Sequence, residues 1–304
     1  TTGATNVAVG YRALKANTTA SNNTAVGSSA LVANTTGASN VALGALALDA
    51  NTTADGNSAV GKGALGATTT GALNTAIGLG ALTTNVTGNQ NVALGYNALN
   101  LSTVDGYNTA IGSQSLGGNT TGTQNVAVGY TSSTGNTTGS TNTSIGYAAL
   151  NANTTAGSNT AVGGWSLYAN TTGVSNTAVG KDALKTNTTA SNNTAVGFQA
   201  LLLNTTGTQN ASFGSYSMDV NTTGGNNAAF GHAALNSSTT ASFNASFGAG
   251  SMATNTTGAN NTGLGYNALA ANTTAANNTA VGYVALAANT TGTNNVAVGS
   301  GALA

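Results

Sequence analysis

Residues 23–37 read Asn-Thr-Ala-Val-Gly-Ser-Ser-Ala-Leu-Val-Ala-Asn-Thr-Thr-Gly, and this pattern returns every 17 residues along a chain of 304. The asparagine that opens it and the glycine four residues later are present in all eighteen copies. A fixed period is typical of repeat architectures, in which each unit packs on its neighbours. Seventeen residues are too few for two packed helices but enough for one turn of a β-solenoid. We therefore predict an all-β, parallel β-solenoid of about eighteen coils, running uninterrupted over residues 1–304 as a segment of a longer fibre.

The two invariant columns are expected to keep the coils in register. Asparagines stacked at the strand spacing can hydrogen-bond amide to amide, as in asparagine ladders. The glycines either need a positive φ at a corner or lie where a close backbone approach leaves no room for a Cβ, and the sequence leaves both explanations open. The predicted ladder columns begin with Asn6, Asn23, Asn40, Asn57 and Asn74, and with Gly10, Gly27, Gly44, Gly61 and Gly78.

Two bulky columns are interpreted as the core. The residue before the glycine is always Val, Ile, Leu or Phe, and Leu usually stands four residues after the glycine. Only the three coils with Phe have Ala two residues earlier, at Ala211, Ala228 and Ala245. Residues two apart on a strand share a face, so this size compensation predicts that both columns point inward. The predicted core includes Val9, Leu14, Val26, Leu31, Phe213, Phe230 and Phe247.

The columns that would then point outward hold almost only Ala or Ser, which suggests close packing against another copy of the chain. We predict interchain contacts at Ala8, Ala13, Ala25 and Ala30. Ordering costs about 1.5 kcal/mol per residue, and two bulky core side chains per coil offset little of that cost. Lateral partners would supply the missing burial. Two different contact faces suit a closed ring, and a homotrimer is the simplest such ring.

Composition argues against most other classes of function. Five basic and five acidic residues cancel, so nothing attracts a polyanion and we expect no nucleic-acid partner. One His, no Cys and no Glu leave no metal or catalytic constellation, so we expect neither an enzyme nor a cofactor. Gly-x-Gly matches such as Gly78-Leu79-Gly80 arise from the repeat and do not indicate a phosphate-binding loop. No apolar run has membrane-spanning length, so no membrane insertion is expected in this segment.

The positions just after the glycine vary most and carry most aromatic residues. These loops are the expected contact surface for a cell-surface or host receptor. The candidates are Tyr11, Tyr96, Tyr130, Trp165, Tyr266 and Tyr283.

The runs Asn-Thr-Ala-Val-Gly, Asn-Val-Ala-Leu-Gly and Asn-Thr-Ala-Ile-Gly resemble the repeats in the heads of trimeric autotransporter adhesins. The longer unit with Gly-Tyr-x-Ala-Leu and Asn-Thr-Thr-Gly looks like repeats of phage tail-fibre proteins. The resemblance covers the whole chain and implies a left-handed, trimeric β-roll on a bacterial surface or a virion tail fibre. The adhesin heads use a shorter repeat, so their cross-section does not transfer directly.

Together these patterns predict a non-enzymatic, extracellular, fibrous protein that serves as the rigid shaft or head of a surface adhesin or tail fibre. Two alternatives remain open. One is a self-assembling extracellular filament subunit that stacks end to end. The other is an ice-binding solenoid built on the threonine pairs, such as Thr18-Thr19, although a threonine-rich corner whose hydroxyls cap backbone groups explains adjacent threonines better. The Asn-x-Thr runs also match glycosylation sequons on nearly every coil.

Overall fold

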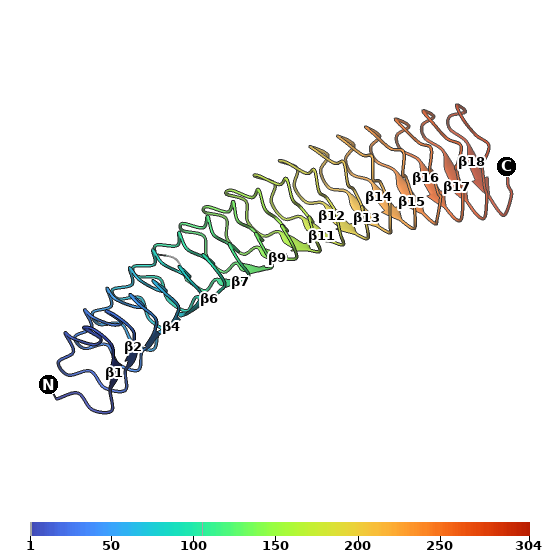
Figure 1. Ribbon diagram of the computed structural model, residues 1–304. Helices are drawn as coiled ribbons and strands as arrows, with labels where there is room; N and C mark the ends of the chain where they lie inside the picture. The colour runs from blue at the N-terminus through green and yellow to red at the C-terminus, as the bar shows by residue number, and fades with distance from the viewer. Residues whose placement is uncertain (1, 105) are drawn as a thin grey trace. The chain divides into compact units, whose positions relative to one another are not determined.

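The fold was analysed in a computed structural model, which describes residues 2–104 and 106–304. All regular secondary structure in these residues is β-strand, with one three-residue strand per repeat. The chain divides into two compact units, Thr1–Thr155 and Ala156–Ala304, and each stacks its strands in chain order (Figure 1). The first unit contains β1 (Val7–Val9), β2 (Thr24–Val26), β3 (Val41–Leu43), β4 (Ser58–Val60), β5 (Thr75–Ile77), β6 (Val92–Leu94), β7 (Thr109–Ile111), β8 (Val126–Val128) and β9 (Thr143–Ile145). The second contains β10 (Thr160–Val162), β11 (Thr177–Val179), β12 (Thr194–Val196), β13 (Ala211–Phe213), β14 (Ala228–Phe230), β15 (Ala245–Phe247), β16 (Thr262–Leu264), β17 (Thr279–Val281) and β18 (Val296–Val298).

Neighbouring strands within each unit pair in parallel, and each residue lies opposite its equivalent in the next repeat. In the first unit Ala25 pairs with Ala42, and in the second Ala178 pairs with Ala195. The ladder also continues outside the strands, because the amide of Leu31 donates to the carbonyl of Ala47 at 3.0 Å. The prediction of an all-β, parallel β-solenoid is confirmed. This coil-to-coil pairing also accounts for a sequence without proline, which cannot donate to a ladder.

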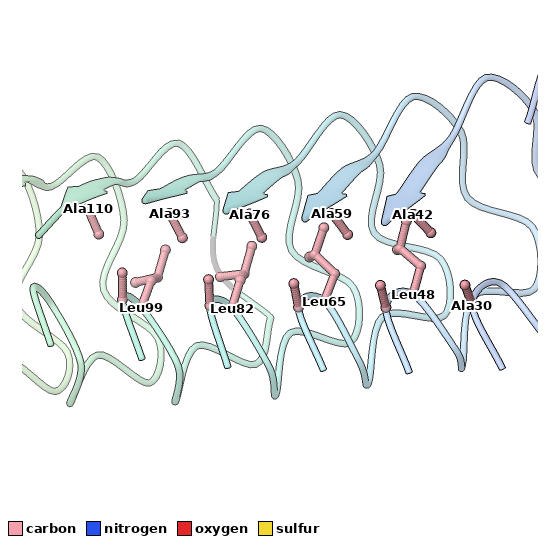
Figure 2. Packing of buried hydrophobic residues seen from close by; sticks show 14 of the residues in the cluster. Ala30, Ala42, Leu48, Ala59, Leu65, Ala76, Leu82, Ala93, Leu99 and Ala110 are labelled. Carbon is pink, nitrogen blue, oxygen red and sulfur yellow. The ribbon is translucent and has the colours of Figure 1, made fainter. Parts of the chain in front are cut away.

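The core is narrow and is lined by alanine on one wall and leucine on the other. Figure 2 shows Ala42 and Ala59 pointing down from their strands toward Leu48 and Leu65, which rise from the opposite side of the coil. All four side chains are fully buried. Leu14 and Leu31 belong to the same buried row, as the sequence predicts.

The sidedness predicted for the strand is wrong. Ala25 and Ala30 are fully buried inside their own coil, Ala13 packs against that core, and Ala8 stands in the same inward column through its pairing with Ala25. The column before the glycine points outward. Its members Val9, Val26, Phe213, Phe230 and Phe247 are half-buried or exposed, with Val9 reaching 56% exposure. Because each coil closes over only 17 residues, its interior accepts leucine from one wall only if the facing wall is small.

Two asparagine columns fill the rest of the interior. In the predicted ladder, Asn23 Oδ1 accepts the backbone N–H of Asn40 at 2.9 Å and its Nδ2 at 3.2 Å. A second column, which begins at Asn17 and contains Asn34, is also buried. The two columns meet at one acceptor, since the side-chain amides of Asn23 and Asn34 both donate to the carbonyl of Gly37 at 2.9 Å. The turn chemistry of the Asn-Thr-Thr stretch predicts a third corner or a short third strand, so sequence reasoning misses the role of this second column in the core.

One coil has serine in place of its core leucine, and the buried serine hydroxyl finds a hydrogen-bond partner. Ser133 stands in the leucine column, and Ser132 and Ser144 occupy positions that are alanine in most other coils. The hydroxyls of Ser132 and Ser133 each lie 2.8 Å from the Ser144 hydroxyl, which donates onward to the carbonyl of Val126. Because buried hydroxyls need partners, the three serines satisfy one another's hydrogen-bonding needs as a set.

Enlarging the alanine wall is expected to unfold the coil without altering any surface. Ala178→Leu would place extra carbons in a fully buried position on β11, and overpacking of this kind costs about 1–3 kcal/mol. The matched control is Val179→Leu, one residue along on the outer side, where other coils already carry leucine. Chemical unfolding followed by circular dichroism should show a lower midpoint for the first variant only. An unchanged midpoint for Ala178→Leu would contradict the placement of the alanine column inside the coil.

Candidate interaction surface

The outer strand face is formed by the first and third residues of every strand. The first residue is Thr, Val, Ser or Ala, and the third is Val, Ile, Leu or Phe in every coil. The third column is half-buried or exposed in every coil, with Leu43 and Leu264 both 47% exposed. No charged residue occurs in either column. An uncharged face with an apolar residue on every coil is a candidate interaction surface.

Three phenylalanines stack along this face in the second unit. The ring centroids of Phe213 and Phe230 are 4.7 Å apart, and those of Phe230 and Phe247 are 4.8 Å apart, with the rings within 8° of parallel in both pairs. The first residue of each of these strands is alanine instead of the usual Thr or Val. The inferred same-face relation between the two columns is therefore correct, but the face is the outer one.

A glycine corner ends every strand and separates the outer strand face from the variable loops. Both explanations left open by the sequence hold there. At Gly44, φ is +139°, and a Cβ would lie 2.6 Å from the carbonyl oxygen of Gly61 in the next coil. Gly10, Gly27, Gly61 and Gly78 share the positive φ and the close approach. The chain therefore turns sharply and presents the following residues on a separate edge.

The predicted receptor-contact residues lie along this edge, in both units. Five of the six are exposed, namely Tyr11, Tyr96, Tyr130, Tyr266 and Tyr283, while Trp165 is partly buried. Aromatic rings in neighbouring coils stack, with centroids 5.6 Å apart in the pairs Tyr130–Tyr147 and Tyr266–Tyr283. The edge therefore carries short aromatic rows rather than one continuous stripe.

The asparagine and the first threonine of the Asn-Thr-Thr stretch use their polar groups internally, whereas the second threonine, such as Thr36, is exposed. Thr35 Oγ1 donates to the carbonyl of Thr52 in the next coil at 3.0 Å, as expected for hydroxyls that cap backbone groups. Asn34, the asparagine of the sequon, is fully buried, and its amide nitrogen donates to Gly37. A glycan on that nitrogen would require the folded coil to open, so the folded solenoid does not carry a glycan stripe at these positions.

Titratable groups are scattered, and across residues 2–104 and 106–304 no group of three or more His, Cys, Asp or Glu side chains is placed to hold a metal ion. Partial burial raises the pKa of the Asp49 and Asp219 carboxyls, although backbone hydrogen bonds act to lower it. A raised pKa in the folded state means that protonation favours folding, so stability from these two groups grows as the pH falls. In the part of the chain that the structure describes, no helix has the length and hydropathy to cross a membrane.

Comparison with known proteins gives no match for this chain among protein-family models or among curated proteins.

Proposed function

We propose that this chain is a non-enzymatic, extracellular structural and adhesive fibre, the rigid shaft or head of a bacterial surface adhesin or a virion tail fibre. The observation that carries the proposal is the outer strand face. A soluble chain that leaves an uncharged apolar column on every coil exposes a surface that lateral association would bury. The resemblance of its repeats to those of trimeric adhesin heads and tail fibres favours a homotrimer.

The size of the outer strand face suits this role. Nine strands at about 4.8 Å spacing, each about 10 Å long, give each unit a face of roughly 430 Å². Each unit therefore presents about half of the surface that one partner contributes to a standard interface, roughly 800 Å². The proposed contact surface is therefore this face, and no longer the alanine columns.

A second copy of the same chain is the partner that fits best. Rotational symmetry places equivalent coils of each copy at the same axial height. The phenylalanines at β13, β14 and β15 would then meet at equal heights, and the alanines beside them leave room for the larger rings. A face exposed only to water would need no such compensation. Mechanically, parallel ladders in three chains would hold a binding surface away from a cell or virion.

Charges introduced on the outer strand face are expected to separate the copies and leave the coils folded. Val162→Asp with Val196→Asp places two carboxylates two coils apart on β10 and β12. Sedimentation velocity should give a trimer for the parent chain and a monomer for this variant, with the β-sheet circular dichroism signal kept. The matched control adds the same charges two coils apart on the loop edge, as Tyr266→Asp with Ser300→Asp, and should remain trimeric.

Either of two results would contradict the assembly proposal. The first is a parent chain that sediments as a stable folded monomer at micromolar concentration. The second is a trimer that persists after both valines become aspartate, which would place the contact elsewhere on the coil.

A further inference from the structure

The second unit gathers unusual residues on one part of its loop edge, which we call the Trp165 cluster. The chain has one tryptophan, one histidine and five basic residues, and this cluster holds the tryptophan, the histidine and two of the lysines on five successive coils. Its members are Trp165, Lys181, Lys185, Phe198, Tyr216 and His232. In a chain with so few charged and aromatic residues, this concentration distinguishes the cluster from the rest of the edge.

Two lysines lie over the aromatic rings. Lys181 Nζ is 5.6 Å from the ring centroid of Trp165 and 6.0 Å from that of Phe198. Lys185 Nζ is 5.5 Å from the ring of Trp165. Distances of this size are typical of cation–π contacts, which hold an ammonium group against the ring face.

The aromatic row continues beyond the lysines. Phe198 and Tyr216 meet edge to face with centroids 5.3 Å apart, and Tyr216 meets His232 in the same way at 6.0 Å. From the coil of Trp165 to that of His232 there are four coil steps, or about 19 Å. The row is therefore long enough for an oligomeric ligand.

The backbone fixes these side chains in place. Trp165 and Tyr216 both have a left-handed backbone, with φ of 55° and 57°. The Tyr216 amide donates to the carbonyl of Phe198 in the coil before it at 3.0 Å. A backbone held in a hydrogen-bonded ladder loses little conformational freedom on binding, which favours recognition by a preorganised surface.

Only one of the two lysines is neutralised by an acid. Asp182 is 5% exposed, and its carboxylate lies 2.9 Å from Lys185 Nζ. Among the described residues this is the one ion pair that brings a carboxylate within 4 Å of a lysine or arginine, so Lys181 has no such partner. Its ammonium group therefore stands among aromatic rings as an available positive charge.

We propose that the Trp165 cluster binds an acidic glycan, with Lys181 pairing with a sugar carboxylate while Tyr216, whose ring neither lysine covers, packs against a sugar ring. The negative face of an aromatic ring attracts the weakly positive C–H groups of a sugar. An ammonium–carboxylate hydrogen bond adds the selectivity for an acid. This inference rests on the proposed adhesive function and names the class of ligand that the loop edge would recognise.

Nucleic acid fits the same cluster less well. Binders of single strands combine stacking rings with a positively charged groove that follows successive phosphates. Here the chain is neutral overall, and Lys181 alone supplies the cluster with a cation that no described carboxylate neutralises. A glycan with one carboxylate per few sugars matches that charge, whereas a phosphate on every nucleotide does not.

The test uses the full chain and isothermal titration calorimetry with four probes. These are hexagalacturonate for uronic acids, 3′-sialyllactose for sialic acids, maltohexaose as a neutral glycan and a twenty-residue oligothymidylate. We expect one of the acidic glycans to bind best, and which one it is identifies the source of the carboxylate. Lys181→Gln should weaken acidic-glycan binding by about tenfold and leave weak maltohexaose binding unchanged, because one charge-assisted hydrogen bond is lost. Tyr216→Ala should weaken binding of both classes.

Lys62→Gln is the matched control, because Lys62 occupies the same repeat position as Lys181 and has Ala45 and Leu79 as its equivalents in the flanking coils. The inference is overturned if neither acidic glycan binds, if Lys62→Gln and Lys181→Gln weaken binding equally, or if oligothymidylate binds more tightly than every glycan. Sedimentation of the same samples separates the two proposals. A trimer that binds no glycan refutes only this inference, and a monomer that binds one refutes only the assembly.

Discussion

Gly61→Ala is expected to lower the free energy of unfolding by about 3–5 kcal/mol, among the largest effects of any single added methyl group in this chain. Gly61 has φ of +131°, and a Cβ there would lie 2.4 Å from the carbonyl oxygen and 2.6 Å from the carbonyl carbon of Gly78. Neither coil moves away easily, because the Gly78 amide donates to the carbonyl of Val60 at 2.8 Å. Guanidinium unfolding followed by circular dichroism measures the loss.

Gly63→Ala, two residues further on, is the matched control. Gly63 also has a positive φ, 66°, but no atom of another residue beyond its chain neighbours lies within 4 Å of the place that a Cβ would occupy. Other coils carry residues such as Arg12 and Ser29 at the same position with φ of 56° and 57°. The control should therefore cost only about 1 kcal/mol, the ordinary penalty for a left-handed residue. Equal losses for the two variants would mean that the backbone approach at the corner is not what requires glycine.

Asn227→Leu is the second large effect we expect, a loss of about 4 kcal/mol from a substitution that keeps the number and branching of the side-chain heavy atoms. Asn227 Oδ1 accepts the backbone N–H of Asn244 at 3.0 Å and its side-chain amide at 3.2 Å. Asn227 Nδ2 donates to the carbonyl of Ala241 at 2.8 Å. Leucine would leave these buried groups without their partners, at about 1–3 kcal/mol each.

The neighbouring residue provides the comparison. Asn226 is exposed and has φ of 59°, so Asn226→Gly keeps the backbone conformation and removes an exposed amide. Thermal and guanidinium unfolding should show little change for this variant. If the free energy of unfolding falls no more at Asn227 than at Asn226, the asparagine ladder adds little to the stability of a core formed by alanine and leucine.

The period, the strand and the first asparagine ladder could be predicted because each follows from a column of invariant residues. Register is fixed when every repeat has the same length, so the pairing of Ala25 with Ala42 needs no tertiary information. In a stack of identical asparagines, each side-chain amide can accept a hydrogen bond at its oxygen and donate one from its nitrogen. Few other arrangements satisfy both groups along the column.

The inside and outside of the strand could not be assigned on the same grounds. The compensation between Phe213 and Ala211 shows that the two share a face, but it is symmetric between the two sides of the strand. What decides the side is the room inside the closed coil, and the buried second asparagine column occupies part of that room. The recurrence of asparagine at Asn17 and Asn34 is a usable signal for it, since an exposed turn would tolerate more variation.

The left-handed backbone at the core leucines carries no sequence signal. Leu31 has φ of 49° and Leu48 has φ of 50°, values that are costly for a bulky residue. Local propensity would place neither leucine there. Burial of the side chain and the bond from the Leu31 amide to Ala47 offset that cost in the folded coil, so only the complete coil explains the conformation.

The hydrogen bonds that join successive asparagines of the first column run from the later coil to the earlier one. The backbone N–H of Asn40 reaches back to Asn23, and that of Asn57 reaches back to Asn40. An acceptor is thus in place on the earlier coil before the later one is synthesised. Contacts separated by only 17 residues need no distant part of the polypeptide. Coils can therefore form in order from the amino terminus, each pairing with the coil already formed.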